Sequence, residues 1–273
     1  MGAAITFAII QRDIAWLDSN KNFEQLREWA LTASRQADFI VLAETFSTGF
    51  AVNNLGITEE MGKQSREFLL DIASELHVWI AGSFIEKCGT TDSENFVNYN
   101  TCMVAGPRGE AFEYRKLHPF TPGGEHRDVL PGSKIQVISI GGIRLTPFLC
   151  YDLRFANIFW DSAHDTDVFV VMANWPQTRQ SHWNTLLSSR AIENQAYVVG
   201  CNRIGAGGGN EYHGGSQVVD PSGRVVASLG NESAILFAQI DPHLVQLTRS
   251  SFPCLADRRH GDSYTLEMNS AAL

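Results

Sequence analysis

Short apolar runs alternate with longer amphipathic stretches along the first half of the chain. Residues 4–10 (AITFAII) and 37–44 (ADFIVLAE) are almost wholly apolar over the length of a strand, which predicts two buried strands. Residues 19–35 lie between them and repeat their apolar side chains at helical spacing, and the stretch at about 61–77 does the same. The pattern therefore predicts strand, helix, strand, helix as the opening of the fold.

The same alternation returns after a hairpin. Residues 78–86 and 97–106 are expected to be strands, and the turn residues GPRGE at 106–110 predict a hairpin with the next strand. The second half is expected to contain strands at 143–150, 166–174 and 196–202, helices at about 154–163 and 180–194, and a hairpin across 215–230. No Pro-, Gly- or Ser-rich linker interrupts this order, so we expect one α/β domain over residues 1–266 and a flexible tail at 267–273.

Charge and composition narrow the function classes. The 273-residue chain carries a formal net charge of −9, which argues against a nucleic-acid partner, because such proteins present a basic surface. No apolar run reaches the length of a membrane span. The five cysteines form no Cys-x-x-Cys pair and favour a reducing compartment, so a cytoplasmic protein is expected. Neither His-Glu-x-x-His nor a zinc-type cysteine pair occurs, so no metal site is expected.

Three chemically complementary residues stand at the ends of predicted strands. Glu44 closes the run 37–44, Lys116 follows the hairpin strand, and Cys150 ends the run TPFLC. Each has an ordinary structural explanation by itself: a bridging or capping carboxylate, a surface lysine and a buried cysteine. Together they fit one chemistry, because α/β folds tend to collect active-site residues at the carboxyl ends of strands.

A thiol nucleophile needs both a base and a nearby cation. Glu44 can accept the thiol proton and later deliver it to a leaving amine. Lys116 can stabilise the oxyanion of a tetrahedral intermediate, together with the backbone N–H of Tyr151, the residue after Cys150. No Gly-x-Ser-x-Gly turn offers a competing serine nucleophile. GAGGGN at 205–210 is expected to be a flexible loop rather than a phosphate-binding one, because its last position is Asn.

The segments around these positions extend the pattern. Glu44 lies in LAETFSTGF, Lys116 in YRKLHPF and Cys150 in FLCYDLRF. The chain also contains, in this order, QRDIAWLDSNKNF near the start, GGEH at 123–126, MANWP at 172–176, RAIENQAYVVGCNRIG at 190–205 and FPCLADR at 252–258. Over nearly the whole chain these motifs resemble the nitrilase superfamily of carbon–nitrogen hydrolases, with its Glu-Lys-Cys triad. LAETFSTGF, and MANWP with the following HWNTLLSSRAIENQ, are most similar to the omega-amidase branch, the YafV type.

The resemblance implies a four-layer αββα sandwich that forms a homodimer and uses no metal or organic cofactor. It implies that Glu44 is the general base and then acid, Cys150 the nucleophile and Lys116 the cation on the oxyanion side. Glu125 matches the family's second glutamate, which orients the lysine and helps to place the substrate. The apolar side of the helix at 180–194 is compatible with a dimer interface and equally with packing in the core.

The omega-amidase branch implies a small-molecule amide substrate that carries a carboxylate, such as 2-oxoglutaramate or 2-oxosuccinamate. Recognition of that carboxylate calls for an arginine. Arg154 is the first candidate and Arg179 a second, with Trp175 as an apolar wall. Three alternatives stay open: a structural salt bridge of Arg154 to Asp152 or to another residue, ordinary core packing of Trp175, and a solvated charge at Arg179.

Three functions remain in view. An omega-amidase would release a 2-oxo acid and ammonia through a cysteine thioester. Another amidase or an aliphatic nitrilase of the same superfamily would keep the triad and change the pocket. A catalytically silent binding or scaffold member would normally have lost a triad residue, whereas all three are present in this chain.

Overall fold

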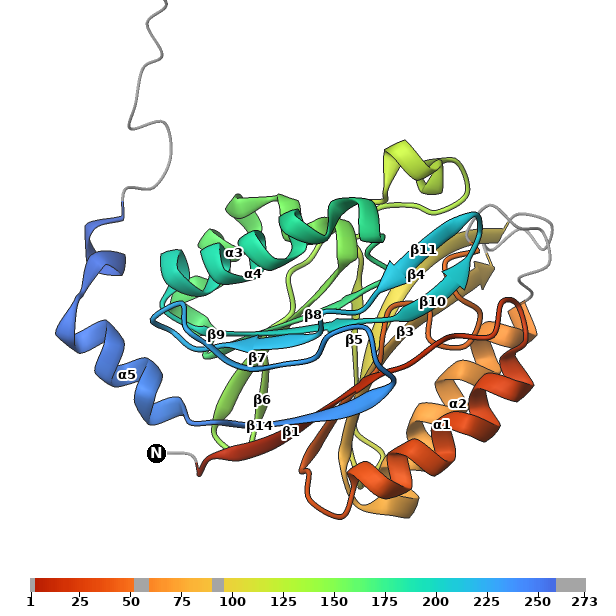
Figure 1. Ribbon diagram of the computed structural model, residues 1–273, viewed down its shortest axis with the longest axis horizontal. Coiled ribbons are helices and arrows are strands. Elements are labelled where there is room, and N and C mark those ends of the chain that lie inside the picture. Colours follow the sequence, from red (N-terminus) through yellow and green to blue (C-terminus); the bar gives the residue numbers. More distant parts are fainter. Residues whose placement is uncertain (1–2, 52–58, 90–95, 259–273) are drawn as a thin grey trace, which may run out of the picture.

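Two six-stranded sheets pack face to face at the centre of the computed structural model, which describes residues 3–51, 59–89 and 96–258 (Figure 1). The strands span Ile5–Gln11 (β1), Phe39–Val41 (β2), Trp79–Gly89 (β3), Phe96–Ala105 (β4), Ala111–Arg115 (β5), Ile138–Ile140 (β6), Ile143–Leu149 (β7), Val168–Ala173 (β8), Tyr197–Asn202 (β9), Ile204–Gly207 (β10), Asn210–His213 (β11), Gln217–Val219 (β12), Val225–Ser228 (β13) and Ala234–Ile240 (β14). One sheet has the order β14-β1-β2-β3-β4-β5 and the other β13-β12-β9-β8-β7-β6, while β10 and β11 pair with each other as a separate hairpin.

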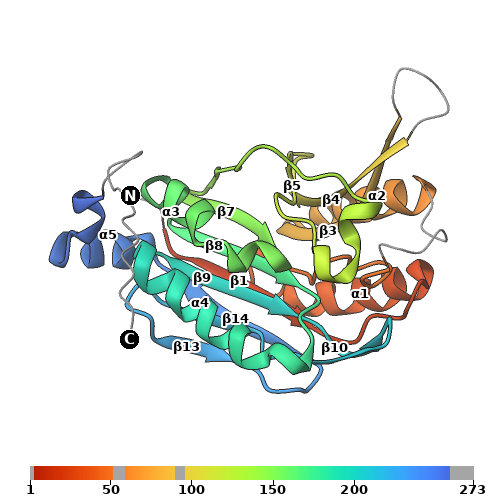
Figure 2. The same ribbon diagram turned by 90° about the horizontal axis from the view of Figure 1, so that it is seen from above.

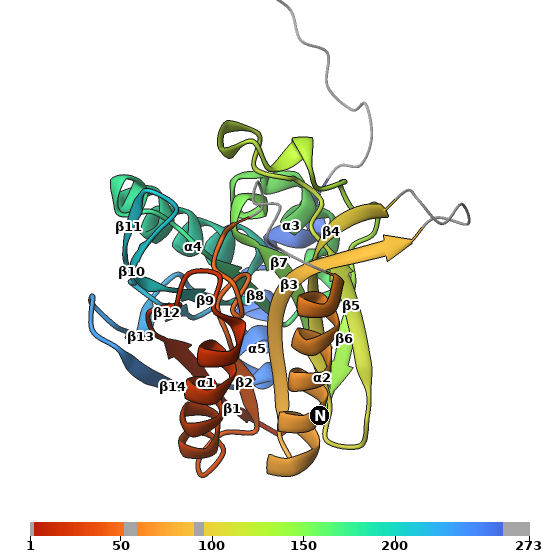
Figure 3. The same ribbon diagram turned by 90° about the vertical axis from the view of Figure 1, so that its right-hand side faces the viewer.

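Helices on the outside complete four layers. They span Ser19–Ala33 (α1), Glu59–Leu76 (α2), Ala156–Ser162 (α3), Gln180–Asn194 (α4) and Pro242–Ser251 (α5). α1 and α2 pack against each other, and α2 lies along β3 (Figure 3). α3 and α4 lie over β7, β8 and β9 of the other sheet (Figure 2). The fold is therefore the predicted αββα sandwich.

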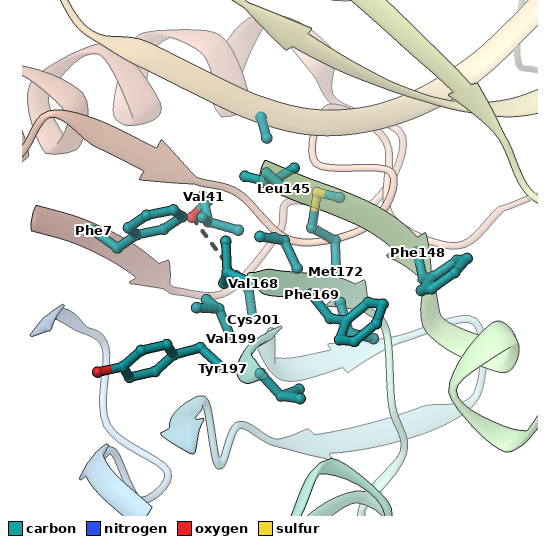
Figure 4. Close-up of a cluster of buried hydrophobic side chains, with 14 of the residues drawn as sticks. Phe7, Val41, Leu145, Phe148, Val168, Phe169, Met172, Tyr197, Val199 and Cys201 are labelled. Carbon is teal, nitrogen blue, oxygen red and sulfur yellow. Dashed lines mark hydrogen bonds between the residues drawn. The ribbon is translucent and has the colours of Figure 1, made fainter. Parts of the chain in front are cut away.

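The residues of β1 explain why its sequence is apolar on both faces. Phe7 and Ile9 point into the layer between the sheets, whereas Ala8 and Ile10 belong to the cluster beneath α1 and α2. Successive side chains of a strand point to opposite faces, so a strand covered on both faces is apolar throughout. Figure 4 shows part of the buried core around the sheet that contains β7 and β8, with Phe7, Val41, Leu145, Phe148, Val168, Phe169, Met172, Tyr197, Val199 and Cys201. Phe148 and Phe169 lie on the face that packs against Phe159 of α3.

The structure tests some of the features predicted from the sequence and leaves others as predictions. The apolar side of α4, including Trp183 and Leu187, is buried within the chain's own core. The expected homodimer and cytoplasmic location stay predictions. The predicted end of the domain at 266 and the tail at 267–273 lie outside the described residues. Among the described helices, none combines the length and the apolar character that a membrane span requires.

Parallel pairing within each sheet positions the strand ends that matter. β1, β2 and β3 are parallel neighbours, and so are β7, β8 and β9. Glu44 follows β2 by three residues, and Cys150 and Asn174 follow β7 and β8 directly. Lys116 comes directly after β5. The carboxyl ends of parallel strands lie at one edge of a sheet, where α/β proteins place their sites.

Candidate active site

Lys116 is buried between two glutamates. Its Nζ lies 2.8 Å from Glu44 Oε1 and 2.8 Å from Glu125 Oε2. All three side chains are fully buried. Glu125 begins a short 3-10 turn that ends at Arg127, and it also accepts a hydrogen bond from the backbone N–H of Phe120. The structure thus brings together three of the four residues expected to be catalytic, in one buried ion cluster.

Two asparagines that the sequence patterns do not single out complete this cluster. Asn100, within β4, donates its side-chain amide to Glu44 Oε1 at 2.9 Å and to Glu125 Oε1 at 3.0 Å. Asn174 donates its backbone N–H to Glu44 Oε2 at 3.1 Å and its side-chain amide to the Glu44 carbonyl oxygen at 2.7 Å. Both oxygens of the Glu44 carboxylate are therefore held by hydrogen bonds.

Cys150, the fourth expected catalytic residue, occupies a tight turn at the end of β7. Its φ angle of 42° lies in the left-handed region, which is costly for a residue with a side chain. Thr45, directly after Glu44, has a φ angle of 45°. The Sγ atom of Cys150 lies 3.9 Å from the Asn174 carbonyl oxygen. Backbone strain of this kind is concentrated at functional sites, where the surrounding structure maintains it.

Neighbouring carboxylates keep Lys116 protonated, and burial keeps the Cys150 thiol protonated. Burial by itself lowers the pKa of Lys116, but the negative charges of Glu125 and Glu44 outweigh this effect and raise that pKa above its ordinary value. Burial raises the pKa of the Cys150 thiol, and the charge of Glu44 raises it further, against the opposing effect of Lys116. The resting site therefore combines a neutral thiol with a charged ammonium, and the sulfur becomes a strong nucleophile only when its proton is transferred.

Cys150 lines a cavity of about 530 Å³, a size typical of small-molecule sites. Six aromatic residues line this cavity: Trp16, Phe50, Phe120, Tyr151, Trp175 and Tyr212. Its polar lining includes Arg154, Arg179 and Asn174. In the described part of the chain, no group of three His, Cys, Asp or Glu side chains is placed to hold a metal ion.

Arg154 and Arg179 line this cavity, and neither forms an ion pair with a carboxylate of the described residues. The guanidinium carbon of Arg154 lies 4.7 Å from the centre of the Trp175 ring, and that of Arg179 lies 5.6 Å from the centre of the Phe120 ring. Asp152 accepts its hydrogen bonds from other groups, so the alternative of an Arg154–Asp152 salt bridge is wrong.

The two guanidinium groups are close enough to interact unfavourably. Burial lowers the pKa of Arg154, and the positive charge of Arg179 lowers it further. Nη2 of Arg154 lies 3.3 Å from Nδ1 of His182. Two neighbouring cations in an aromatic cavity are a favourable environment for an anion.

Trp175 lines the cavity and also packs in the hydrophobic core. Its side chain is almost fully buried, its Nε1 donates to the Arg179 carbonyl oxygen at 2.7 Å, and its ring centre lies 5.5 Å from that of Trp183. Tyr151 lines the cavity with its side chain, and its backbone N–H directly follows Cys150 in the chain. The structure thus places every predicted site residue in or beside one cavity.

The glycine-rich segment 205–210 is not the expected flexible loop. It forms the turn and part of the strands of the β10–β11 hairpin, because Ile204 to Gly207 pair in register with Asn210 to His213. Gly208, Asn210 and Tyr212 of this hairpin line the cavity. The ring of Trp16 packs so closely on Gly208 that an added methyl group would lie 2.6 Å from it. This hairpin is therefore a wall of the site.

Comparison with known proteins agrees with this geometry. The family model for carbon-nitrogen hydrolases matches residues 6–250. The 2-oxoglutaramate amidase of Bacillus subtilis and omega-amidase YafV of Yersinia enterocolitica are each 34% identical to this chain, over 93% of it and 97% of the relative. A solved mutant of the amidase from Nesterenkonia sp. AN1 has a TM-score of 0.78 and 25% identity, over 92% of this chain and 96% of that one. That structure shows covalent addition of the acetamide moiety of fluoroacetamide at the active-site cysteine.

The chain therefore belongs to the carbon-nitrogen hydrolase family, the nitrilase superfamily. The family match covers most of the chain and includes the segments that carry Glu44, Lys116 and Cys150. The superfamily expected from the sequence motifs and its α/β sandwich are confirmed. The protein is a carbon–nitrogen hydrolase enzyme.

Proposed function

We propose that this enzyme is an omega-amidase, which hydrolyses the terminal amide of short 2-oxo dicarboxylic acid monoamides such as 2-oxoglutaramate and 2-oxosuccinamate. The pair Arg154 and Arg179 carries this proposal, because two guanidinium groups that have no acidic partner among the described residues share a cavity with Cys150. Guanidinium groups bind carboxylates with two parallel hydrogen bonds. The two named relatives at 34% identity support the same substrate class.

Acylation of the thiol is the first half of the proposed reaction. Glu44 accepts the proton of the Cys150 thiol as the sulfur forms a bond to the amide carbon. An ammonium has three N–H donors, and Lys116 gives two of them to the glutamates, which leaves one for the new oxyanion. The backbone N–H of Tyr151 is the proposed second donor. Glu44 then returns the proton to the nitrogen, the carbon–nitrogen bond breaks, and ammonia leaves a thioester.

Hydrolysis of the thioester is the second half. A water molecule loses a proton to Glu44 and attacks the thioester carbon, which forms a second oxyanion in the same place. The carbon–sulfur bond breaks, the sulfur recovers the proton from Glu44, and the 2-oxo acid is released. Glu125 and Asn100 keep Lys116 and Glu44 in place through both steps. No group outside this chain, apart from substrate and water, takes part in these steps.

Removal of one guanidinium at a time tests the substrate assignment. Arg154→Gln and Arg179→Gln are assayed with 2-oxoglutaramate and with butyramide, a neutral amide of the same scale. A charge-assisted hydrogen bond contributes about 1.5–3 kcal/mol, so each variant should lose about 10- to 100-fold in kcat/KM for 2-oxoglutaramate, mainly through KM. The kcat/KM of each variant for butyramide should stay within about twofold of the wild-type value, because butyramide has no carboxylate.

Arg108→Gln is the matched control, because the Arg108 side chain is 86% exposed, pairs with Glu110 and is not among the residues that line the cavity. Equal losses for both amides would show that the arginines support the structure and do not bind the carboxylate. Wild-type turnover of butyramide without turnover of 2-oxoglutaramate would identify a different amidase. Turnover of the corresponding nitrile in place of either amide would identify a nitrilase.

A further inference from the structure

Asp152 is a fully buried carboxylate with four hydrogen-bonding contacts, three of which it accepts from a hydroxyl or a backbone N–H. Its Oδ1 accepts from the backbone N–H of His118 at 3.0 Å and lies 2.9 Å from His118 Nδ1. Its Oδ2 accepts from the Tyr114 hydroxyl at 2.7 Å and from the backbone N–H of Leu149 at 3.1 Å. A buried carboxylate with this many donors is fully satisfied, and removing one of its oxygens leaves buried donors without a partner.

The donors come from both sides of the proposed catalytic residues. Tyr114 stands two residues before Lys116, and His118 stands two residues after it. Leu149 directly precedes Cys150, and Asp152 itself follows Cys150 by two residues. One carboxylate therefore connects the segment that carries the lysine to the turn that carries the nucleophile.

Other hydrogen bonds hold the lysine segment without reaching the nucleophile turn. The backbone N–H of Lys116 donates to the Asn100 carbonyl oxygen in β4, and the Lys116 carbonyl oxygen accepts from Gly132. These bonds fix Lys116 to its own sheet and to the loop beyond Glu125. Asp152 supplies a second connection to the other sheet, at the end of β7, beside the one that runs from Lys116 through Glu44 to Asn174.

Two more contacts stiffen this connection. The His118 ring stacks on Phe155 with a centroid distance of 3.6 Å and an interplanar angle of 7°. The Tyr114 hydroxyl also accepts from the backbone N–H of Leu117 at 3.2 Å. Burial and the nearby charge of Asp152 raise the pKa of Tyr114 well above its ordinary value, so the hydroxyl remains a donor at physiological pH. The left-handed backbone of Cys150 lies inside the turn that these contacts hold, and strain of that kind persists only when its surroundings maintain it.

We propose that Asp152 is a positioning residue, which holds the Lys116 ammonium and the Cys150 thiol at the separation that the reaction needs. Asp152 contacts neither substrate nor reacting atoms in this role. It acts through Tyr114 and His118 on one side and through the backbone of Leu149 on the other. The inference rests on the proposed role of Cys150 as the nucleophile, but not on the identity of the substrate.

The test follows the reactivity of Cys150 toward iodoacetamide, which requires no substrate. The rate constant for alkylation of the Cys150 peptide is measured by mass spectrometry between pH 6 and 10, for the wild type, Asp152→Asn and Tyr114→Phe. Asp152→Asn should lower the rate constant at pH 8 by about tenfold and move the pH dependence to higher pH, because the segment that carries Lys116 and the turn that carries Cys150 are no longer held at a fixed separation. Tyr114→Phe removes one of the four contacts and should lower it by about threefold.

Thr146→Val is the matched structural control. Thr146 is fully buried in β7, and its hydroxyl pairs with that of Thr166 at 2.6 Å, away from Asp152. This variant should lower the Tm while the rate constant for Cys150 stays at the wild-type value. If Asp152→Asn also lowers the Tm but keeps the wild-type rate constant and pH dependence, Asp152 is structural only and the proposal is wrong. Should Asp152→Asn prove insoluble, Tyr114→Phe decides: an unchanged rate constant and pH dependence overturn the proposal.

Discussion

The side-chain amide of Asn100 donates to Glu44 Oε1 at 2.9 Å, the same oxygen that accepts from Lys116. The amide also reaches Glu125 Oε1 at 3.0 Å, so one neutral residue connects the two carboxylates. Two buried carboxylates repel each other unless donors and a cation lie between them. Asn100 and Lys116 together supply both, and they fix the orientation of the carboxylate that the proposed reaction uses as its base.

Asn100→Ala should therefore impair catalysis without removing any charged group. We expect kcat to fall by about 10- to 100-fold, because a misdirected general base loses most of its contribution. Asn98→Ala is the control: Asn98 lies two residues earlier on β4 and donates to the Asp128 carbonyl oxygen outside the cluster. Steady-state kinetics of both variants checks this expectation. Equal kcat values for the two variants would contradict it.

The close contact between Trp16 and Gly208 predicts a difference between two neighbouring glycines. Gly208 and Gly209 both have positive φ angles, so an alanine is strained at either position. A Cβ at Gly208 would lie 2.6 Å from the Trp16 ring, whereas a Cβ at Gly209 meets nothing within 4 Å. Gly208→Ala should raise KM by about fivefold or more, because a displaced Trp16 changes the cavity wall. Gly209→Ala should lose similar stability and keep the wild-type KM; the same KM for both would contradict this assignment.

Buried thiols predict a loss of stability at alkaline pH. Burial raises the pKa of Cys102 and Cys201 above the ordinary value for cysteine. In the unfolded chain these thiols lose their protons near pH 8.5, whereas in the folded chain they keep them. The folded state then binds more protons, so the free energy of unfolding falls as pH rises, by up to about 1.4 kcal/mol per pH unit for each thiol.

Cys201→Ala isolates one of these contributions. Its free energy of unfolding is measured by urea denaturation with a reducing agent at several values between pH 7 and pH 10. The decline with pH should be shallower than in the wild type by about 1.4 kcal/mol per unit above pH 9. An identical decline in both proteins would show that the Cys201 thiol ionises as readily in the folded chain as in the unfolded one.

The positive charges of the two arginines should also make the enzyme discriminate between related amide substrates. The α-ammonium group of glutamine is repelled by Arg154 and Arg179, whereas the 2-oxo group of 2-oxoglutaramate is not. We expect kcat/KM for glutamine to be about 100-fold lower than for 2-oxoglutaramate or more. Glutaramate, which has neither group, should lie close to 2-oxoglutaramate. Comparable values for glutamine and glutaramate would contradict a repulsive effect of these guanidinium groups.

The layered fold and the triad positions follow from local patterns in the sequence. An apolar run such as residues 4–10 can only be a buried strand or a short buried helix, and its length and β-branched residues favour the strand. Glu44, Lys116 and Cys150 are recognisable because each puts a reactive group at or just after the end of a strand. That these residues lie at the same end of the two sheets depends on the parallel strands, which the alternation with helices predicts.

Features that depend on contacts between segments far apart in the sequence cannot be predicted from these local patterns. Asn100 lies in β4, where nothing in the local sequence sets it apart from Asn98, and only the fold shows that Glu44 and Glu125 face it. β14 pairs with β1, so that Ile240, near the other end of the chain, lies opposite Ile5. No local sequence pattern predicts that pairing. The glycines at 205–210 indicate a loop locally, yet pairing with Asn210 to His213 makes a hairpin of them.

The most direct test of the central claim is ammonia release from freshly prepared open-chain 2-oxoglutaramate, measured for the wild type and Cys150→Ala side by side. The account predicts release by the wild type and none above background by the variant. It also predicts that mass spectrometry of the quenched wild-type reaction finds an acyl group on the Cys150 peptide. Ammonia release that survives in Cys150→Ala would contradict the proposed nucleophile, and no release by either protein would contradict the proposed substrate.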